Sequence, residues 1–299
     1  MADTLYVVLG ASGHVGGTIS ERLLDARKRV RVVARHADKL KGLGARGAEV
    51  VPGSVEDPAF LRRALDGAGA AFVLLPPYLG PGIRDWQDRT AAAIGDALEA
   101  AKVPRAVSLS SIGADKPSGN GPIAGVHALE RRLDRIRGLV PLHLRPGYFF
   151  ENNLAAIGMI KAMGGLGGAL RADVKMAHIA AHDIGEAAAN RLAVLDWTGR
   201  TVQELQGERD LTMPEVAAAL GRAIGKPELG YVQFPYADAE KGMVAAGLPQ
   251  ELAALYGEMA RGFNDGHLAP TQRRSAATTT PTSIERWAAQ VFAPAFAAG

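Results

Sequence analysis

A glycine-rich turn near the amino terminus constrains the fold of this chain more than any other feature. It reads Gly10-Ala11-Ser12-Gly13-His14-Val15-Gly16 and directly follows the apolar, β-rich run 5–9. Residues 15–24 then place apolar side chains at helical spacing, and 30–34 is a second β-rich run. A strand, a glycine turn, a helix and a further strand in this order are typical of a parallel α/β sheet.

The same alternation continues through the first half of the chain. Further strands are predicted at 49–51, 70–75, 106–110 and 141–145, and helices at 58–65, 84–101 and 124–137. Asp57 is the expected N-cap of the helix that begins at Pro58. Strands and helices alternating at this spacing predict an α/β fold with a Rossmann-type, doubly wound parallel sheet in residues 1–150.

After Pro146 the alternation changes, and residues 151–299 are predicted to form a smaller, mainly helical, substrate-side domain interleaved with returns to the main sheet. A strand is expected at 201–205 and a helix capped by Thr212 after it. Further helices are expected at 237–246, 251–264 and 283–292, and Asp183 is expected to cap another helix. The chain has 299 residues, 47% of them hydrophobic, which is enough to bury a core of this size.

The composition argues against several classes of function. Without cysteine, the chain has no disulfide and no thiolate nucleophile, which fits a cytoplasmic protein. Segment 67–83 is uncharged but interrupted by prolines and glycines, so no membrane association is expected. A net charge of +3 without a recognition motif does not favour a nucleic-acid partner. His178 and His182 have helical spacing but no third ligand in pattern, so no metal site is expected.

The glycine turn itself predicts a dinucleotide site. Gly10 would permit the tight turn, Gly13 the close approach of a pyrophosphate to backbone N–H groups, and Gly16 the close packing of helix and strand. Ser12, His14 and Val15 lie in the same turn and are included among the expected cofactor contacts. The alternative is an ordinary turn between a strand and a helix.

The charge that follows the second strand bears on which nucleotide is bound. NAD-specific sites place a carboxylate there, which accepts a hydrogen bond from the ribose. This chain has Arg35 at that point and Lys39 nearby, and a cation pairs well with a 2′-phosphate. NADPH is therefore the expected cofactor, unless these cations are only solvated surface groups.

Open α/β sheets bind ligands where their strands end, so residues after the fourth and fifth strands are candidates. Leu75 and Pro76 are expected to contact the cofactor, and Tyr78 to form part of a rigid wall beside the nicotinamide. The hydroxyl of Ser110 or Ser111 is expected to bond the substrate oxygen or the nicotinamide amide, or else to cap the following turn.

Two aromatic residues follow the sixth strand. Tyr148 and Phe149 are expected to line a flat apolar pocket for an aromatic substrate, with core packing accounting for at least one ring of the run 148–150. The expected partner is thus a small aromatic molecule, and a homodimer is left open.

These motifs, together with Leu74-Leu75-Pro76-Pro77, the run 108–111 and the run 144–152, make the chain resemble NmrA-like members of the atypical short-chain dehydrogenase/reductase superfamily. The runs 182–188 and 281–285 extend the resemblance over nearly the whole chain. The resemblance implies an NADPH-dependent oxidoreductase that transfers a hydride to a quinone or a similar conjugated, aromatic acceptor. It also implies an alternative, a non-catalytic NADP(H)-binding redox sensor that acts through a protein partner.

The chain departs from ordinary members of that superfamily in its proton donor. They use Tyr-x-x-x-Lys, whereas none of the six tyrosines here has a lysine four residues later. In isoflavone-reductase-like relatives, the stretch that corresponds to 125–132 is similar but has a lysine where His127 stands. The resemblance implies that His127 takes the place of that lysine and contacts the ribose or donates a proton. Imidazole exchanges protons near neutral pH, although a lone helical histidine is more often structural or exposed.

Overall fold

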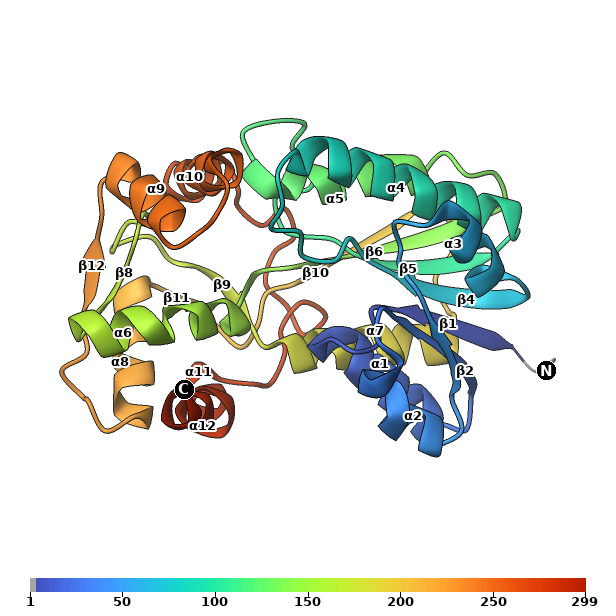
Figure 1. Ribbon diagram of the computed structural model, residues 1–299, viewed down its shortest axis with the longest axis horizontal. Coiled ribbons are helices and arrows are strands. Elements are labelled where there is room, and N and C mark those ends of the chain that lie inside the picture. Colours follow the sequence, from blue (N-terminus) through green and yellow to red (C-terminus); the bar gives the residue numbers. More distant parts are fainter. Residues whose placement is uncertain (1–3) are drawn as a thin grey trace.

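A seven-stranded parallel sheet forms the right-hand lobe of the computed structural model, which describes residues 4–299 (Figure 1). Its strand order is β10-β6-β5-β4-β1-β2-β3. The bounds are β1 Leu5–Leu9, β2 Arg29–Ala34, β3 Glu49–Pro52, β4 Ala68–Val73, β5 Arg105–Leu109, β6 Val140–Pro146 and β10 Thr201–Leu205. The order reverses between β1 and β4, so the predicted Rossmann-type, doubly wound fold is confirmed.

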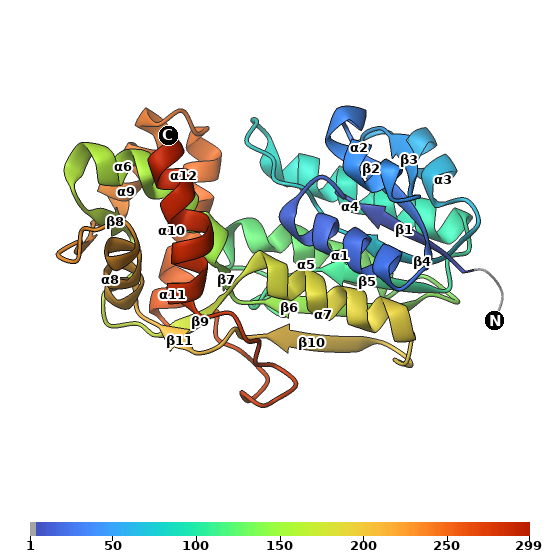
Figure 2. The same ribbon diagram turned by 90° about the horizontal axis from the view of Figure 1, so that it is seen from below.

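Helices cover both faces of this sheet (Figures 1 and 2). One face carries α1 (His14–Asp25), α2 (Lys41–Ala45) and α7 (Ala181–Val194), and the other carries α3 (Pro58–Leu65), α4 (Ile83–Ala100) and α5 (Ala124–Leu133). Successive β1 residues therefore enter different cores: Val8 belongs to the core that includes Ile19 of α1, and Val7 to the core that includes Ile94 of α4. Burial on both faces explains why β1 is apolar along its whole length.

The second lobe is built around a separate apolar core that includes Phe150, Leu220, Trp287 and Phe292. Its strands are β7 Tyr148–Phe149, β8 Leu166–Gly168, β9 Met176–Ile179, β11 Asp210–Leu211 and β12 Tyr231–Gln233. Its helices are α6 Ile157–Met163, α8 Met213–Ala223, α9 Tyr236–Ala245, α10 Gln250–Asn264, α11 Ile284–Trp287 and α12 Ala293–Ala298. This lobe lies beyond the carboxyl ends of β4, β5 and β6, so the two lobes meet where ligands are expected (Figure 1).

The local signals at helix starts are confirmed. The carboxylate of Asp57 accepts hydrogen bonds from the N–H groups of Ala59 and Phe60, at 2.9 and 3.1 Å. Thr212 and Glu215 form a reciprocal capping box at the start of α8. The predicted end of α5 is wrong, because the helix stops at Leu133 instead of residue 137 and the chain turns towards β6.

The expectation that Asp183 caps a helix is also wrong. Asp183 lies inside the first turn of α7, and its carboxylate accepts hydrogen bonds from the backbone N–H and the hydroxyl of Thr282, at 2.9 and 2.6 Å. The start of α7 is satisfied by Glu151 instead, which accepts from the N–H of Ala181 at 3.0 Å. Glu151 also accepts from the indole N–H of Trp287 at 2.9 Å, so both carboxylates fasten the carboxy-terminal segment to the rest of the chain.

Candidate active site

The glycine turn joins β1 to α1 in a conformation that requires glycine at two positions. Gly10 has a φ of +68°, and its carbonyl oxygen accepts a hydrogen bond from the N–H of Gly13 at 3.0 Å. A Cβ atom on Gly16 would lie 2.4 Å from the same oxygen. The turn is therefore closed tightly against the first turn of α1.

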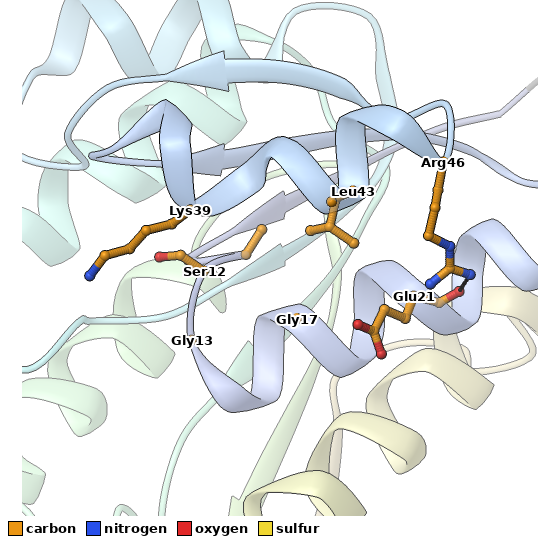
Figure 3. A pocket seen from close by; sticks show the side chains of 9 residues that line it. Ser12, Gly13, Gly17, Glu21, Lys39, Leu43 and Arg46 are labelled. Carbon is orange, nitrogen blue, oxygen red and sulfur yellow. Dashed lines mark hydrogen bonds between the residues drawn. The ribbon is translucent and has the colours of Figure 1, made fainter.

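A cavity of about 330 Å³ opens beside this turn (Figure 3). It is lined by Ala11, Ser12, Gly13, Gly17, Glu21, Lys39, Gly42, Leu43 and Arg46. No side chain caps α1, so the N–H groups of its first turn have neither a helical partner nor a side-chain acceptor. Unpartnered N–H groups at a helix start attract anions, so these residues fit the pyrophosphate of a dinucleotide.

Cations lie at both ends of the cavity. Lys39 extends past Ser12 at the glycine-turn end, whereas Arg46 lies beside Glu21 at the other end (Figure 3). Arg46 pairs with Asp25 at 2.6 Å, which neutralises much of its charge. Arg35 directly follows β2, is exposed, and takes part in no ion pair among residues 4–299, although it does not line the cavity. Sequence reasoning missed Arg46 because its distance from the glycine turn is set by the path of α2.

The loop after β4 lies beside the glycine turn because β4 is the neighbour of β1. A Cβ atom on Gly10 would meet Leu74 at 2.8 Å, so this loop begins against the glycine turn. Leu75 and Pro76 follow directly and remain predicted cofactor contacts. Tyr78 turns towards α4, where its ring stacks on Trp86 with centroids 4.6 Å apart. The Tyr78 hydroxyl donates to the carbonyl of Pro81 at 3.0 Å, so its proton is engaged within the loop.

Ser110 and Ser111, at the end of β5, both have their hydroxyl protons engaged. Ser110 donates to Glu130 Oε1 at 2.5 Å and is 6% exposed, and Ser111 donates to the carbonyl of Ile112 at 2.9 Å. Each hydroxyl oxygen can still accept a hydrogen bond. Ser110 is thus suited to receive an N–H from a carboxamide, and ill suited to donate to a substrate oxygen.

His127 lies on α5 with a fixed orientation. Its Nδ1 is 2.7 Å from the carbonyl oxygen of Ala114. A carbonyl only accepts, so Nδ1 carries a proton and a neutral His127 presents a bare Nε2. Nε2 makes no hydrogen bond with any residue between 4 and 299, and the ring is half-buried. This atom can therefore take up a proton or donate one to a ligand.

Tyr148 and Phe149 point to opposite sides of β7. Phe149 packs against the core of the main sheet, whereas Tyr148 packs in the second lobe with its ring edge towards His178, at 5.3 Å between centroids. Burial raises the pKa of Tyr148 to about 12, and the nearby Tyr256 contributes in the same direction. Tyr256, on α10 of the same lobe, was missed by sequence reasoning, because the two tyrosines are far apart in the sequence and meet only through the packing of that lobe.

Two other features of the described chain bear on function. Within residues 4–299, no helix has both the length and the apolar character that a bilayer crossing requires. Over the same range, no three histidine, aspartate or glutamate side chains gather as a metal site. His178 lies on β9 and His182 on α7, so they do not share a helical face as their spacing suggested.

The reversed strand order, the tight glycine turn and the uncapped start of α1 define a Rossmann-type protein that binds a dinucleotide. Residues 10–158 match a family described as NAD(P)H-binding. The chain is 31% identical over 258 residues to the (4-alkanoyl-5-oxo-2,5-dihydrofuran-3-yl)methyl phosphate reductase of Streptomyces griseus, covering 84% of each chain. The chain therefore belongs to the family of that reductase, and its NAD(P)H-binding domain fits the resemblance of its motifs to NmrA-like atypical short-chain dehydrogenases/reductases.

Two further comparisons extend this result. The NAD(P)H azoreductase of Xenophilus azovorans is 29% identical over 257 residues, which cover 85% of this chain and 86% of that protein. The quinone oxidoreductase QOR2 of Escherichia coli, solved with NADPH, is 26% identical with a TM-score of 0.81, over 96% of this chain and 99% of that one. These relatives are reductases, and the chain is accordingly an NAD(P)H-dependent reductase, as the first interpretation of the sequence predicts.

Proposed function

We propose that this reductase prefers NADPH and passes the hydride to a flat, conjugated acceptor of the quinone class. When bound, NADPH supplies a hydride, which carries both electrons of the reduction. The residues of the chain hold the nucleotide, orient the acceptor and deliver one proton. The observation that carries the proposal is the free Nε2 of His127 on α5, in a relative of reductases that act on conjugated acceptors.

The preference for NADPH is supported by the charge after β2. Arg35 is exposed and has no carboxylate partner among residues 4–299, and Lys39 reaches into the cavity beside the glycine turn. Both cations are therefore free to pair with a 2′-phosphate, which Arg binds through two parallel N–H groups. Arg46 contributes less, because Asp25 already neutralises it.

The choice of acceptor is supported by the relatives and by the aromatic side chains. A quinone, an azo compound and an unsaturated furanone, the compounds named for these three relatives, share a conjugated system that can accept a hydride at one end. Tyr148 and Tyr256 are half-buried and lie near each other in the second lobe, and aromatic rings of this kind stack well on a flat ligand. A quinone also needs only a weak acid, because its reduced oxygens hold negative charge readily.

His127 is the proposed source of that proton. The Nδ1–H hydrogen bond to Ala114 leaves Nε2 as the ring atom that exchanges protons. Nε2 would take up a proton from water and pass it to the reduced acceptor, which returns His127 to its neutral Nδ1–H form. Ser110, whose hydroxyl donates a hydrogen bond to Glu130, would accept one from the carboxamide of the nicotinamide. This assigns the two residues to separate tasks, proton delivery and cofactor orientation.

The test is NADPH oxidation by the purified protein with matched panels of quinones, azo dyes and saturated ketones. We expect turnover with the quinones, weaker turnover with azo dyes and none with saturated ketones. Replacing His127 with Asn keeps a hydrogen-bonding side chain but removes the exchangeable proton, and we expect a loss in kcat of about 10²-fold. Tight NADPH binding without oxidation by any acceptor would contradict the proposal and point to a sensor.

A further inference from the structure

A buried carboxylate on α5 connects three parts of the active site. Glu130 is 2% exposed and lies one helical turn after His127. Its Oε1 accepts from the hydroxyl of Ser110 at 2.5 Å and from Nε of Arg145 at 2.9 Å, and its Oε2 accepts from the terminal Nη2 of Arg145 at 2.6 Å. The carboxylate thus joins α5 to the ends of β5 and β6.

Glu130 and Arg145 form a bidentate salt bridge that is almost completely buried. Arg145 is 5% exposed. Burial lowers its pKa, but the hydrogen bond and negative charge of Glu130 outweigh that effect, so the net pKa of Arg145 is raised. A parallel pair of N–H···O bonds fixes both the distance and the plane of the two groups. Neither side chain can rotate away without leaving a buried charge unpaired, so the contact is rigid.

This rigidity bears on His127 because the two residues share a face of α5. Side chains three apart on a helix are neighbours, so anchoring Glu130 against the sheet also fixes the helical turn that carries His127. The second restraint on His127 is the hydrogen bond to Ala114, which belongs to the loop after β5. That bond keeps its length only if α5 and the end of β5 hold their separation, and Glu130 with Ser110 spans the same two elements.

We propose that Glu130 is a positioning residue for catalysis, with Arg145 as its fixed partner. Glu130 keeps α5 seated on β5 and β6, so that the Nε2 atom of His127 stays directed at the acceptor. It also holds the Ser110 hydroxyl with its proton turned inward and its oxygen available as an acceptor. The inference rests on the proposed role of His127, but the position of α5 relative to β5 and β6 can be tested without any substrate, through the tautomer of His127.

The substitution Glu130→Gln keeps the shape of the side chain and removes the charge. We expect kcat to fall about 10-fold or more, with the KM for NADPH within about 3-fold of the wild type, since the glycine turn is untouched. In the protein without nucleotide, NMR of the imidazole nitrogens should show the Nδ1–H form of His127 in the wild type and a mixture of both tautomers in the variant. The matched control is Asp183→Asn, which alters another buried, doubly hydrogen-bonded carboxylate and should leave kcat and the tautomer unchanged.

The outcomes separate this inference from the proposed function. If Glu130→Gln retains both the wild-type kcat and the Nδ1–H form, the positioning role is overturned. If His127→Asn keeps full activity while Glu130→Gln still alters the tautomer, the proton role fails and the seating of α5 stands. Should Glu130→Gln not fold, Arg145→Lys keeps the positive charge, loses the two-pronged contact and carries the same two measurements.

Discussion

The carboxylate of Glu251 on α10 accepts a hydrogen bond from the backbone N–H of Gly82 at 3.0 Å. Gly82 immediately precedes α4 and has a φ of +67°, so the contact fixes the end of the loop that carries Leu75, Pro76 and Tyr78. The second lobe therefore holds the loop after β4 directly, at a point far from it in the sequence. Removing this contact should loosen one wall of the active site without touching the core of either lobe.

We expect Glu251→Ala to speed amide hydrogen exchange in peptides that cover 76–86, because the loop loses its anchor on α10. The KM for the acceptor should rise several-fold, and nucleotide affinity should fall less, because the glycine turn is untouched. Hydrogen exchange followed by mass spectrometry measures the first effect. Glu258→Ala, on the same helix, is the control, and equal exchange in the two variants would contradict the anchoring role.

The glycine turn gives a prediction about nucleotide affinity. In Gly16→Ala, the new Cβ would lie 2.4 Å from the carbonyl oxygen of Gly10, so the turn must open. We expect NADPH affinity to fall by about 10-fold or more, since the pyrophosphate depends on the position of these N–H groups. Gly158→Ala, in α6 of the second lobe, is the control, because no atom lies within 4 Å of the added Cβ and the residue does not line the cavity. Equal losses in a titration of the two variants would contradict this explanation.

Nucleotide selectivity should depend on Arg35. Replacing it with Ala removes a charge-assisted contact with the 2′-phosphate, which should weaken NADPH by about 10–100-fold and leave NADH nearly unaffected. Calorimetric titration with both nucleotides measures the ratio. The exposed Arg63 of α3 serves as the control cation, and Arg63→Ala should change neither affinity. A parallel loss of NADPH and NADH binding in Arg35→Ala would show that the arginine acts on the fold instead.

Stability should fall in mild acid because of His178. Burial lowers the pKa of this histidine to about 4, partly offset by its bond to the Met176 carbonyl and by the charges of Asp210 and Glu215. The unfolded chain binds the proton from about pH 6.5 downward, whereas the folded chain binds it only near pH 4. Stability is therefore complete above pH 6.5 and lost progressively towards pH 4, by roughly 3 kcal/mol in total.

Urea denaturation at several pH values tests this in His178→Leu, which has no proton to bind. The variant starts from a lower stability, because it loses the bond to the Met176 carbonyl. Its free energy of unfolding should nevertheless depend less on pH between 6.5 and 4 than that of the wild type. His36→Ala, at an exposed position, should keep the wild-type slope. If the free energy of unfolding depends on pH equally in His178→Leu and the wild type, His178 is not the cause of the acid sensitivity.

The fold of the nucleotide lobe could be predicted because its signals are local. A β-rich run, a glycine turn and a capping residue such as Asp57 each act within a few residues, and β1, β10 and α3 have the predicted bounds. The end of α5 was placed too late because no local stop signal precedes Gly138, and contact with the sheet ends the helix at Leu133 instead.

The site could be predicted only in part, because its key contacts join distant residues. The glycine turn and the position of His127 follow from pattern and resemblance. That Ser110 donates a hydrogen bond to Glu130 depends on how α5 packs against β5. No spacing rule contains that information, and the same holds for Tyr256 and Glu251 on α10.

Strand β10 and helix α7 have a consequence for how the protein is made. β10 pairs with β6 along its whole length, and α7 packs on α1, yet both come after the chain has passed through β7, β8 and β9 of the second lobe. Until residue 205 has left the ribosome, the edge of β6 and the outer face of α1 remain uncovered. A nascent chain that ends at residue 150 is therefore expected to need a chaperone, although it already carries the whole glycine turn.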